Sequence, residues 1–405
     1  MKCIDLFAGA GGLSEGFHRA GFDIVAHVER DHNACLTLKT RLAFHYLNAH
    51  DKIQIYKDYL QGKITRDKLY SYIPSEILNS VINEEINEDT IKNIFDKIDK
   101  IIGNDKIDYI VGGPPCQAYS LMGRAKDPDG MKNDQRNYLY KYYIKFLLHY
   151  QPKMFVFENV EGMLSAQKGQ LFKQIQKEMK TAGYNIDYKI LNAKDFGVLQ
   201  NRRRVILIGW QTEIEYRYPE FSKLKQEYDT YNLFEDLPKL KSGESIQSGK
   251  YISSANECLR NLLIRNDWNL LTQHIVRPNN NNDLEIYRIC IDVWNKERRR
   301  VRYNELPERL ITHKNTKSFL DRFKVVPYEE ISHTVVAHIS KDGHYYIHPD
   351  IQQNRSLSVR EAARIQSFPD DFYFESSRTA AFLQIGNAVP PLMAYLIAKH
   401  IVKAR

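Results

Sequence analysis

The chain has 405 residues, of which 43% are hydrophobic, enough for one large core and a second, smaller unit. Lysine and arginine number 58 against 50 acidic residues, so the formal net charge of +8 favours a polyanionic partner without requiring one. The five cysteines include no C-x-x-C pair, which argues against a disulfide framework or a zinc site and fits a reducing compartment. The sequence shows no signal-peptide pattern and no run of 18 uninterrupted apolar residues, so we expect neither secretion nor a membrane span.

The first apolar run, residues 3–7, predicts a buried parallel strand. Gly9, Gly11 and Gly12 interrupt it before helical spacing resumes over residues 13–20. Glycines let a backbone approach a ligand closely, and the N-terminus of the next helix offers free N–H groups to an anionic group. Position 14 is serine, so the dinucleotide pattern G-x-G-x-x-G is not met, and a purely structural turn remains an alternative.

A second apolar run, residues 24–28, ends in Glu29. An acid about twenty residues after a glycine turn commonly binds a ribose diol. A solvated acid at a strand end is the simpler interpretation of Glu29 alone. Together, the turn and the acid favour a nucleotide-type pocket.

A third apolar run, residues 109–111, leads through two glycines and two prolines to Cys116. A lone cysteine is usually a small core residue. Here the prolines suppress regular structure and the flanking residues are polar, so we favour a reactive thiol. Residues 120–136 are rich in charge, glycine and proline, and we expect them to form a loop that closes over a substrate.

A fourth apolar run, residues 154–157, ends in Glu158. A carboxyl group at the end of a buried strand could donate a proton, although a helix N-cap is the alternative. The segment QNRRR precedes a short strand at residues 205–208. Because alternate residues of a strand point the same way, we expect Arg202 and Arg204 on one face, where they could meet a phosphate or solvent.

Strands that alternate with helical stretches predict an α/β fold, a mostly parallel, doubly wound sheet with helices on both faces. Ligands of such sheets bind at the carboxyl ends of the strands, where all four special segments lie. Residues 48–107 have helical periodicity, whereas from about residue 212 the alternation is lost and a smaller mixed domain is expected. Helical spacing returns at residues 356–368 and 391–402. We therefore divide the chain into a catalytic and cofactor-binding domain (1–212), a recognition domain (213–330), a connecting region (331–380) and a C-terminal segment that packs back on the first domain (381–405).

Most of the surplus positive charge lies in one stretch. Between Lys296 and Lys324 there are ten basic and four acidic residues, a local excess of six. This stretch, which includes Arg298, Arg299 and Arg300, suits contacts to a polyanion, with an ordinary solvated face as the alternative.

Together these segments resemble the ordered motif set of the cytosine-5 DNA methyltransferases. The matches are DLFAGAGGLSEGF (5–17), GGPPCQAYS (112–120), ENV (158–160), QNRRR (200–204), RSLSVREAARIQSFPD (355–370) and QIGNAVPP (384–391). The resemblance covers nearly the whole first lobe and the C-terminal end, and six motifs in the same order are very specific. It implies a Rossmann-like enzyme that transfers methyl from S-adenosyl-L-methionine to C5 of cytosine in duplex DNA and leaves S-adenosyl-L-homocysteine, without a metal.

The resemblance also implies residue roles. Cys116 would add to C6 of a cytosine flipped out of the duplex, Glu158 would hold or protonate N3, and Arg202 with Arg204 would support the intermediate. The family's acidic contact to the adenine amino group has only a weak counterpart here, Glu85-Ile86. The cofactor pocket would be lined by Phe7, Gly9, Gly11, Gly12, Leu13, Glu29, Pro115, Asn387 and Val389, and Gln117, Ser120 and Arg136 would join the three arginines at the DNA.

Three other functions fit the sequence less well. The tRNA-modifying branch of the family carries a Cys-Phe-Thr tripeptide in its recognition region, and none occurs here. A silent DNA-binding relative would not need Cys116 and Glu158 intact, and Ser14 argues against a nicotinamide dehydrogenase. The length is that of a bacterial or phage modification enzyme, so we expect a cytoplasmic, nucleoid-associated monomer on double-stranded DNA, with a separate cognate restriction endonuclease as a possible partner.

Overall fold

The computed structural model describes residues 1–115, 138–313, 315 and 317–403. The predictions made for Cys116, Gln117, Ser120, Arg136 and the loop at 120–136 therefore lie outside the described residues.

The central sheet has seven strands in the order β3-β2-β1-β4-β5-β8-β6. The five strands from β3 to β5 run parallel, and β8 is antiparallel to both β5 and β6. The mostly parallel sheet is thus confirmed, and the run predicted at 205–208 is the centre of its antiparallel strand. The strands are β1 (Lys2–Leu6), β2 (Asp23–Glu29), β3 (Val81–Asn83), β4 (Tyr109–Gly112), β5 (Met154–Asn159), β6 (Tyr184–Asn192) and β8 (Arg203–Gln211).

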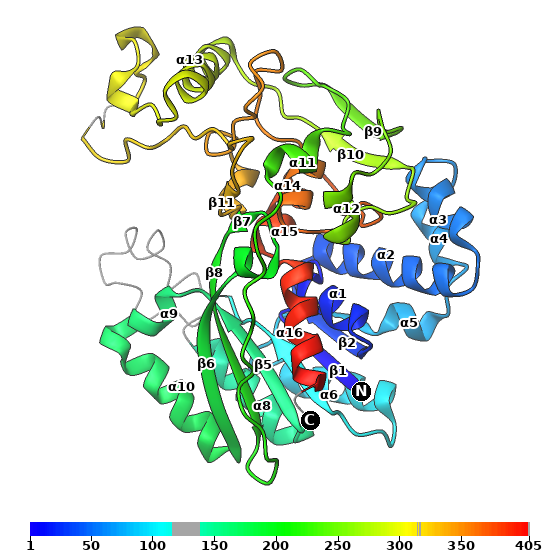
Figure 1. Ribbon diagram of the computed structural model, residues 1–405. Helices are drawn as coiled ribbons and strands as arrows, with labels where there is room; N and C mark the ends of the chain where they lie inside the picture. Colours follow the sequence, from blue (N-terminus) through cyan, green and yellow to red (C-terminus); the bar gives the residue numbers. More distant parts are fainter. Residues whose placement is uncertain (116–137, 314, 316, 404–405) are drawn as a thin grey trace.

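Both faces of the sheet are buried at its centre, because consecutive residues of β4, β5 and β8 enter different hydrophobic clusters. On β4, Tyr109 and Val111 belong to one cluster and Ile110 to the other. The first cluster also contains residues of α1 (Gly12–Arg19) and α16 (Pro391–Lys403), and the second contains residues of α6 (Ile91–Ile102), α8 (Leu139–Tyr150) and α10 (Gln170–Thr181). Figure 1 shows these helices flanking the strands.

Residues 48–107 contain helices, as the periodicity predicts, but also the edge strand β3. Three residues are too few for a pattern to separate a strand from its surroundings. The helices of this interval are α2 (His32–Ala49), α3 (Ile53–Leu60), α4 (Arg66–Tyr70), α5 (Ser75–Asn79) and α6.

The interval 213–330 lacks the alternation of the first lobe. It holds an antiparallel pair, β9 (Ser245–Gly249) with β10 (Leu271–Ile275), and the helices α11 (Thr230–Phe234), α12 (Glu257–Asn261) and α13 (Asn281–Glu297). The chain returns through β11 (Ser332–His333), which pairs in parallel with β7 (Gln200–Asn201). We call residues 213–330 the recognition region, and the exact domain boundaries stay a prediction.

The motif helix is shorter than the predicted 356–368. It is α14 (Val359–Ile365), because Ser358 caps it in a capping box with Glu361 and Ser367 has a φ of 60°. Its Arg364 forms ion pairs with Asp236 of the recognition region, at 2.5 Å, and with Asp370, at 2.6 Å. These buried pairs fix the recognition region to the motif helix.

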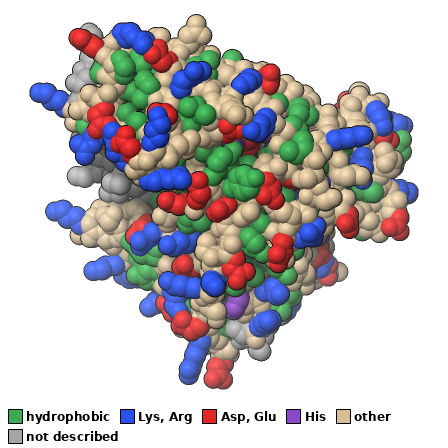
Figure 2. All heavy atoms as spheres, turned by 45° about the horizontal axis from the view of Figure 1, so that its top comes forward, with side chains coloured by type: hydrophobic (Ala, Val, Ile, Leu, Met, Phe, Trp, Pro, Cys, Tyr) green, Lys and Arg blue, Asp and Glu red, His purple; other side chains and the backbone are tan. Residues whose placement is uncertain are grey.

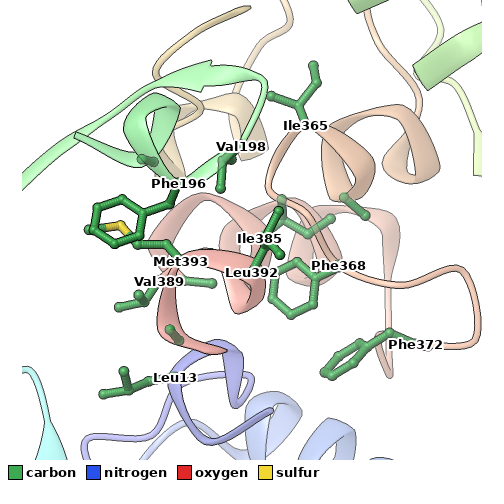
Figure 3. Packing of buried hydrophobic residues seen from close by; sticks show 14 of the residues in the cluster. Leu13, Phe196, Val198, Ile365, Phe368, Phe372, Ile385, Val389, Leu392 and Met393 are labelled. Carbon is green, nitrogen blue, oxygen red and sulfur yellow. The ribbon is translucent and has the colours of Figure 1, made fainter. Parts of the chain in front are cut away.

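The end of the chain packs on its beginning. A Cβ atom on Gly16 of α1 would lie 2.4 Å from the Cβ of Ala394 in α16, so the two helices approach at a glycine. Figure 3 shows Leu13 of α1 below Val389, and both residues belong to the same hydrophobic cluster as Leu392 and Met393 of α16. Among the described residues, the stretch Arg378–Lys403, which comprises α15 (Arg378–Asn387) and α16, is long and apolar enough to cross a membrane, but 72% of its most apolar window is buried, as in a core helix.

Candidate active site

The glycine turn after β1 has two kinds of glycine. A Cβ atom on Gly9, where φ is 54°, would meet no atom of the described chain within 4 Å. A Cβ on Gly11 would lie 2.7 Å from Leu38 Cδ2, and one on Gly12 would lie 2.2 Å from the carbonyl oxygen of Val389. Gly9 therefore borders open space that a ligand can fill, whereas Gly11 and Gly12 are required by packing.

Glu29 is held against this turn by its own strand end. Its Oε2 accepts a hydrogen bond from the Gly9 amide at 2.8 Å, and its Oε1 accepts one from the Asp31 amide at 2.7 Å. Burial raises the pKa of this carboxyl group. Each oxygen keeps a lone pair that can accept a hydrogen bond from a hydroxyl group.

Asp5, at the carboxyl end of β1, was not singled out by the sequence. It is 1% exposed, and neither carboxylate oxygen has a hydrogen-bond partner among the residues described. The nearby Ser14 hydroxyl donates to the Gly11 carbonyl instead, at 3.2 Å. Burial raises the pKa of Asp5 to about 7. The signal in the sequence was an acid inside an apolar strand just before the glycines.

The remaining residues predicted for the cofactor lie around the same turn. Asn387 is exposed at the end of α15, while Pro115 and Phe7 are half-buried. The side chains of Leu13 and Val389 are buried members of the hydrophobic cluster. Backbone groups are therefore the main contribution that these two residues can make to a pocket.

The weak counterpart to the adenine-binding acid follows β3. Glu85 forms an ion pair with Arg30 at 2.7 Å, and both side chains are about half exposed, 55% and 49%. Ile86 is buried. The role of this pair at the adenine stays a prediction.

Glu158 and Arg204 face each other across neighbouring antiparallel strands. Glu158 lies near the end of β5 and Arg204 near the start of β8, and the Arg204 Nε atom is 2.8 Å from Glu158 Oε1. Their side chains are 14% and 12% exposed, so the pair is largely buried. This is a carboxyl group oriented by a guanidinium.

The segment that leads to Cys116 lies against this pair. A Cβ atom on Gly113 would sit 2.6 Å from Glu158 Oε2, so only glycine fits there without a shift. The Asn159 side chain donates to the Pro114 carbonyl at 3.2 Å. These contacts hold Gly113 and Pro114, which precede Cys116 by three and two residues in the sequence, against Glu158 and Asn159.

Arg202 has partners other than those of Arg204. It is fully buried, and it donates to the carbonyl oxygens of Val335 at 2.7 Å and Ala388 at 2.8 Å. Burial lowers the pKa of its guanidinium. The sequence predicted Arg202 and Arg204 on one face; in the structure, Arg204 pairs with Glu158 and Arg202 bonds the backbone of other segments.

The described cysteines are poor nucleophiles. Cys3, Cys35, Cys258 and Cys290 are buried free thiols. Burial raises the pKa of Cys35, Cys258 and Cys290 to about 12 and that of Cys3 well above its usual value. Cys116 is thereby left as the candidate nucleophile of the chain.

Among the described residues, five basic side chains of the basic cluster at 296–324 form ion pairs: Lys296, Arg298, Arg299, Arg309 and Lys324. Arg298 forms two hydrogen bonds to Glu329, at 2.7 and 3.1 Å, and Arg299 pairs with Glu297 and Glu305, each at 2.7 Å. Figure 2 shows Lys and Arg side chains intermixed with Asp and Glu across this side of the molecule. Arg300 is exposed and has no ion pair with any described residue, so it is the arginine of the three most available to a phosphate.

Known proteins resemble this chain along almost its whole length. The model of the C-5 cytosine-specific DNA methylase family matches residues 1–74 and 68–403. The type II methyltransferase M.Bpa9945I of Bacillus paralicheniformis is 43% identical, with 99% of this chain and 98% of that protein covered. M1.HphI of Haemophilus parahaemolyticus, also a type II methyltransferase, is 30% identical over 100% of this chain and 87% of its own length.

A solved structure shares the fold. A prophage-encoded protein of E. coli, described as a candidate DNA modification methyltransferase, superposes with a TM-score of 0.63 at 21% identity, covering 100% of this chain and 99% of that one. With the motif residues gathered at one edge of the sheet and the family model matched along nearly the whole length, the chain belongs to the C-5 cytosine-specific DNA methylases.

Proposed function

We propose that this methyltransferase modifies cytosine in duplex DNA through a covalent bond between Cys116 and C6 of a base flipped out of the helix. The observation that carries the proposal is the Glu158–Arg204 pair at 2.8 Å, with the segment before Cys116 packed on it by Gly113. A stacked base cannot reach such a recessed pair, so the base has to leave the duplex.

The residues of the glycine turn fit S-adenosyl-L-methionine. Glu29 keeps lone pairs for ribose hydroxyls, and the open space at Gly9 admits a ligand close to the backbone. The buried carboxyl of Asp5 has no hydrogen-bond donor among the described residues, and an ammonium group or an ordered water would provide one. Asn387 and Pro115 would complete the pocket. When bound, the cofactor supplies the methyl group that C5 accepts.

In the proposed reaction, Cys116 provides the nucleophile and Glu158 provides the proton for N3. The Cys116 thiolate forms a bond to C6, and the electron pair of the C5–C6 double bond moves toward C5 and N3 while Glu158 holds the proton at N3. Arg204 keeps the Glu158 carboxyl in place and would support the O2 atom of the cytosine. After methylation a base removes the C5 proton, the electron pair restores the double bond, and Cys116 leaves as thiolate.

We further propose that the enzyme is the modification half of a type II restriction–modification system and acts as a monomer. The named relatives M.Bpa9945I and M1.HphI are type II methyltransferases, which supports the role. The cognate endonuclease would act separately on the same DNA sequence. Recognition of that sequence is assigned to residues 213–330, with Arg300 at a phosphate.

The test is methyl transfer to unmethylated genomic DNA and, in parallel, to bulk tRNA, with methyl-labelled cofactor and the variant Cys116→Ala. We expect label in DNA at the cytosine of one short sequence, located by bisulfite sequencing, and none with the variant. Cys258→Ala, which removes a buried thiol, is the matched control and should retain transfer. Label only in tRNA would overturn the DNA assignment, and DNA binding without label would point to a silent relative.

The covalent step has its own test. Oligonucleotides with 5-fluorocytosine at the mapped target cannot lose the C5 substituent as a proton, so the bond to Cys116 should persist. We expect a protein–DNA adduct that survives denaturing electrophoresis, depends on cofactor and disappears in Cys116→Ala. Methyl transfer without any trapped adduct would contradict the covalent route while leaving the methyltransferase assignment intact.

A further inference from the structure

Arg202 is enclosed by carbonyl oxygens. Its Nη1 donates to Val335, and its Nη2 donates to Ala388 at 2.8 Å and to Gly386 at 3.3 Å. No carboxylate of the described chain lies within ion-pair distance of this fully buried side chain. A guanidinium has several donors in a rigid plane. Here those donors join the segment that contains Arg202 to two others, one at Val335 and one at residues 386–388.

A second buried side chain binds the same carbonyl. Gln366, just after α14, donates to Ala388 at 3.2 Å and to Ile385 at 2.6 Å. Gln200 donates to the oxygen of Gln366 at 2.8 Å and accepts from the Val335 amide at 2.9 Å. A connected network of buried polar side chains, Arg202, Gln200 and Gln366, therefore holds the backbone of residues 385–388 in place.

This backbone forms one wall of the predicted cofactor pocket. Ala388 lies between Asn387 and Val389, and the Val389 carbonyl would be 2.2 Å from a Cβ on Gly12. The glycine turn and residues 386–389 are thus in direct contact. Any shift of that backbone moves Asn387 relative to Glu29 on the far side of the turn.

We propose that Arg202 is a positioning residue for cofactor binding and that Arg204 alone of the two arginines serves the base. Arg202 holds residues 386–389 against the glycine turn and so sets the affinity for S-adenosyl-L-methionine. This inference rests on the proposed function, and it replaces the role at the covalent intermediate that the sequence suggested for Arg202.

The test compares Arg202→Lys with Arg204→Lys. The Kd for S-adenosyl-L-homocysteine is measured by calorimetry without DNA, and KM for the cofactor and kcat are measured with DNA. For Arg202→Lys we expect Kd and KM to rise about tenfold or more, since charge-assisted hydrogen bonds are lost, with kcat at saturating cofactor within about threefold. For Arg204→Lys we expect Kd unchanged and kcat lowered at least about a hundredfold.

Arg360→Lys is the matched control for loss of a buried arginine. Arg360 is also fully buried and donates to carbonyls, those of Thr272 and Phe372, but it does not bond residues 385–389. We expect this variant to lower the unfolding temperature as Arg202→Lys does, while leaving Kd for the cofactor product unchanged.

An unchanged Kd for Arg202→Lys with kcat reduced as in Arg204→Lys would overturn the inference and return Arg202 to the base. If Arg202→Lys does not fold, Gln366→Met decides by the same measurement, a raised Kd supporting the inference and an unchanged Kd contradicting it. Failure of the unmodified enzyme to bind the product or to methylate DNA would instead refute the proposed function.

Discussion

Arg204 and Glu158 lie on adjacent antiparallel strands with 2.8 Å between Nε and Oε1, and each is less than 15% exposed. The guanidinium fixes which way the carboxyl group points, and the strands fix where both groups stand. The two arginines that precede Arg204 have other environments. Arg202 is buried and bonds backbone carbonyls, and Arg203 is 55% exposed beside Glu161.

The first prediction concerns this pair. Glu158→Gln removes the proton that N3 needs, and Arg204→Ala leaves the carboxyl without its partner. We expect each variant to lower kcat at least about a hundredfold, the range for loss of a general acid. Single-turnover methyl transfer with saturating DNA and cofactor is the measurement.

Arg203→Ala is the matched control, because Arg203 lies between the other two arginines in sequence but faces solvent. Its ion pair with Glu161 is a surface pair, and such pairs contribute little. We expect kcat to stay within about threefold of that of the unmodified enzyme, far less than the roughly hundredfold drop expected when a general acid is lost. A loss as large as that of Arg204→Ala would show that the segment, not the pair, is what catalysis requires.

The second prediction separates two glycines of one turn. Gly12→Ala places a Cβ 2.2 Å from a carbonyl oxygen, an overpacking that costs about 1–3 kcal/mol and pushes α1 away from residue 389. Gly9→Ala meets no described atom within 4 Å but must adopt a φ of 54°, which costs about 1 kcal/mol.

We therefore expect thermal unfolding to shift more for Gly12→Ala, and cofactor-product binding by the folded Gly9→Ala protein to weaken about tenfold or more, since the methyl takes ligand space. Unchanged binding in Gly9→Ala would place the ligand elsewhere.

The third prediction is a pH dependence from Asp5. Its pKa in the folded protein is raised from 3.8 to about 7 by burial. Above the ordinary pKa the unfolded chain loses this proton while the folded protein keeps it, so the contribution to stability falls from about pH 4 to about pH 7 and is then constant. A fully buried shift of this size corresponds to a loss on the order of 4 kcal/mol.

Asp5→Asn cannot ionise, so its free energy of unfolding should decline less between pH 4 and 7 than that of the unmodified protein. Denaturant unfolding at several pH values in the absence of cofactor measures the difference. Parallel curves for the two proteins would mean that Asp5 has a donor in solution that lowers its pKa. Bound cofactor, if its ammonium is that donor, should flatten the curve of the unmodified protein.

The fourth prediction concerns DNA affinity. Arg300→Ala should weaken binding to any duplex and reduce the slope of log K against log salt by about 1, as one phosphate contact is lost. Arg298→Ala should change the slope less, because Arg298 already has two hydrogen bonds to Glu329. Equal slopes for Arg300→Ala and the unmodified enzyme, measured by fluorescence anisotropy, would remove Arg300 from the interface.

The sequence predicted those parts of the site that depend on one strand and the turn after it. Glu29, Gly9 and Glu158 lie where strand ends place them, because a buried apolar run followed by glycine or an acid has few other structures. The position of Arg204 on Glu158 needed the pairing of β5 with β8, which lies outside any single window.

The remaining features depend on contacts between distant segments. Arg202 bonds residues 133 to 186 positions away, so its spacing from Arg204 could not reveal its partners. In the sequence, Asp5 looks like any polar residue within an apolar strand. Only the structure shows that its carboxylate is buried without a hydrogen-bond partner among the described residues. The basic cluster looked available because its acidic partners include Glu329, 31 residues from Arg298 in the chain.

The contact of Gly12 with Val389 has a consequence for the synthesis of this protein. At bacterial elongation rates of about 5–20 residues per second, Val389 is made roughly 20–80 seconds after Gly12. During that interval the nascent chain carries a finished glycine turn whose other wall does not yet exist. A polypeptide released before Val389 is added would therefore lack one wall of the proposed cofactor pocket, and we expect it not to bind the cofactor.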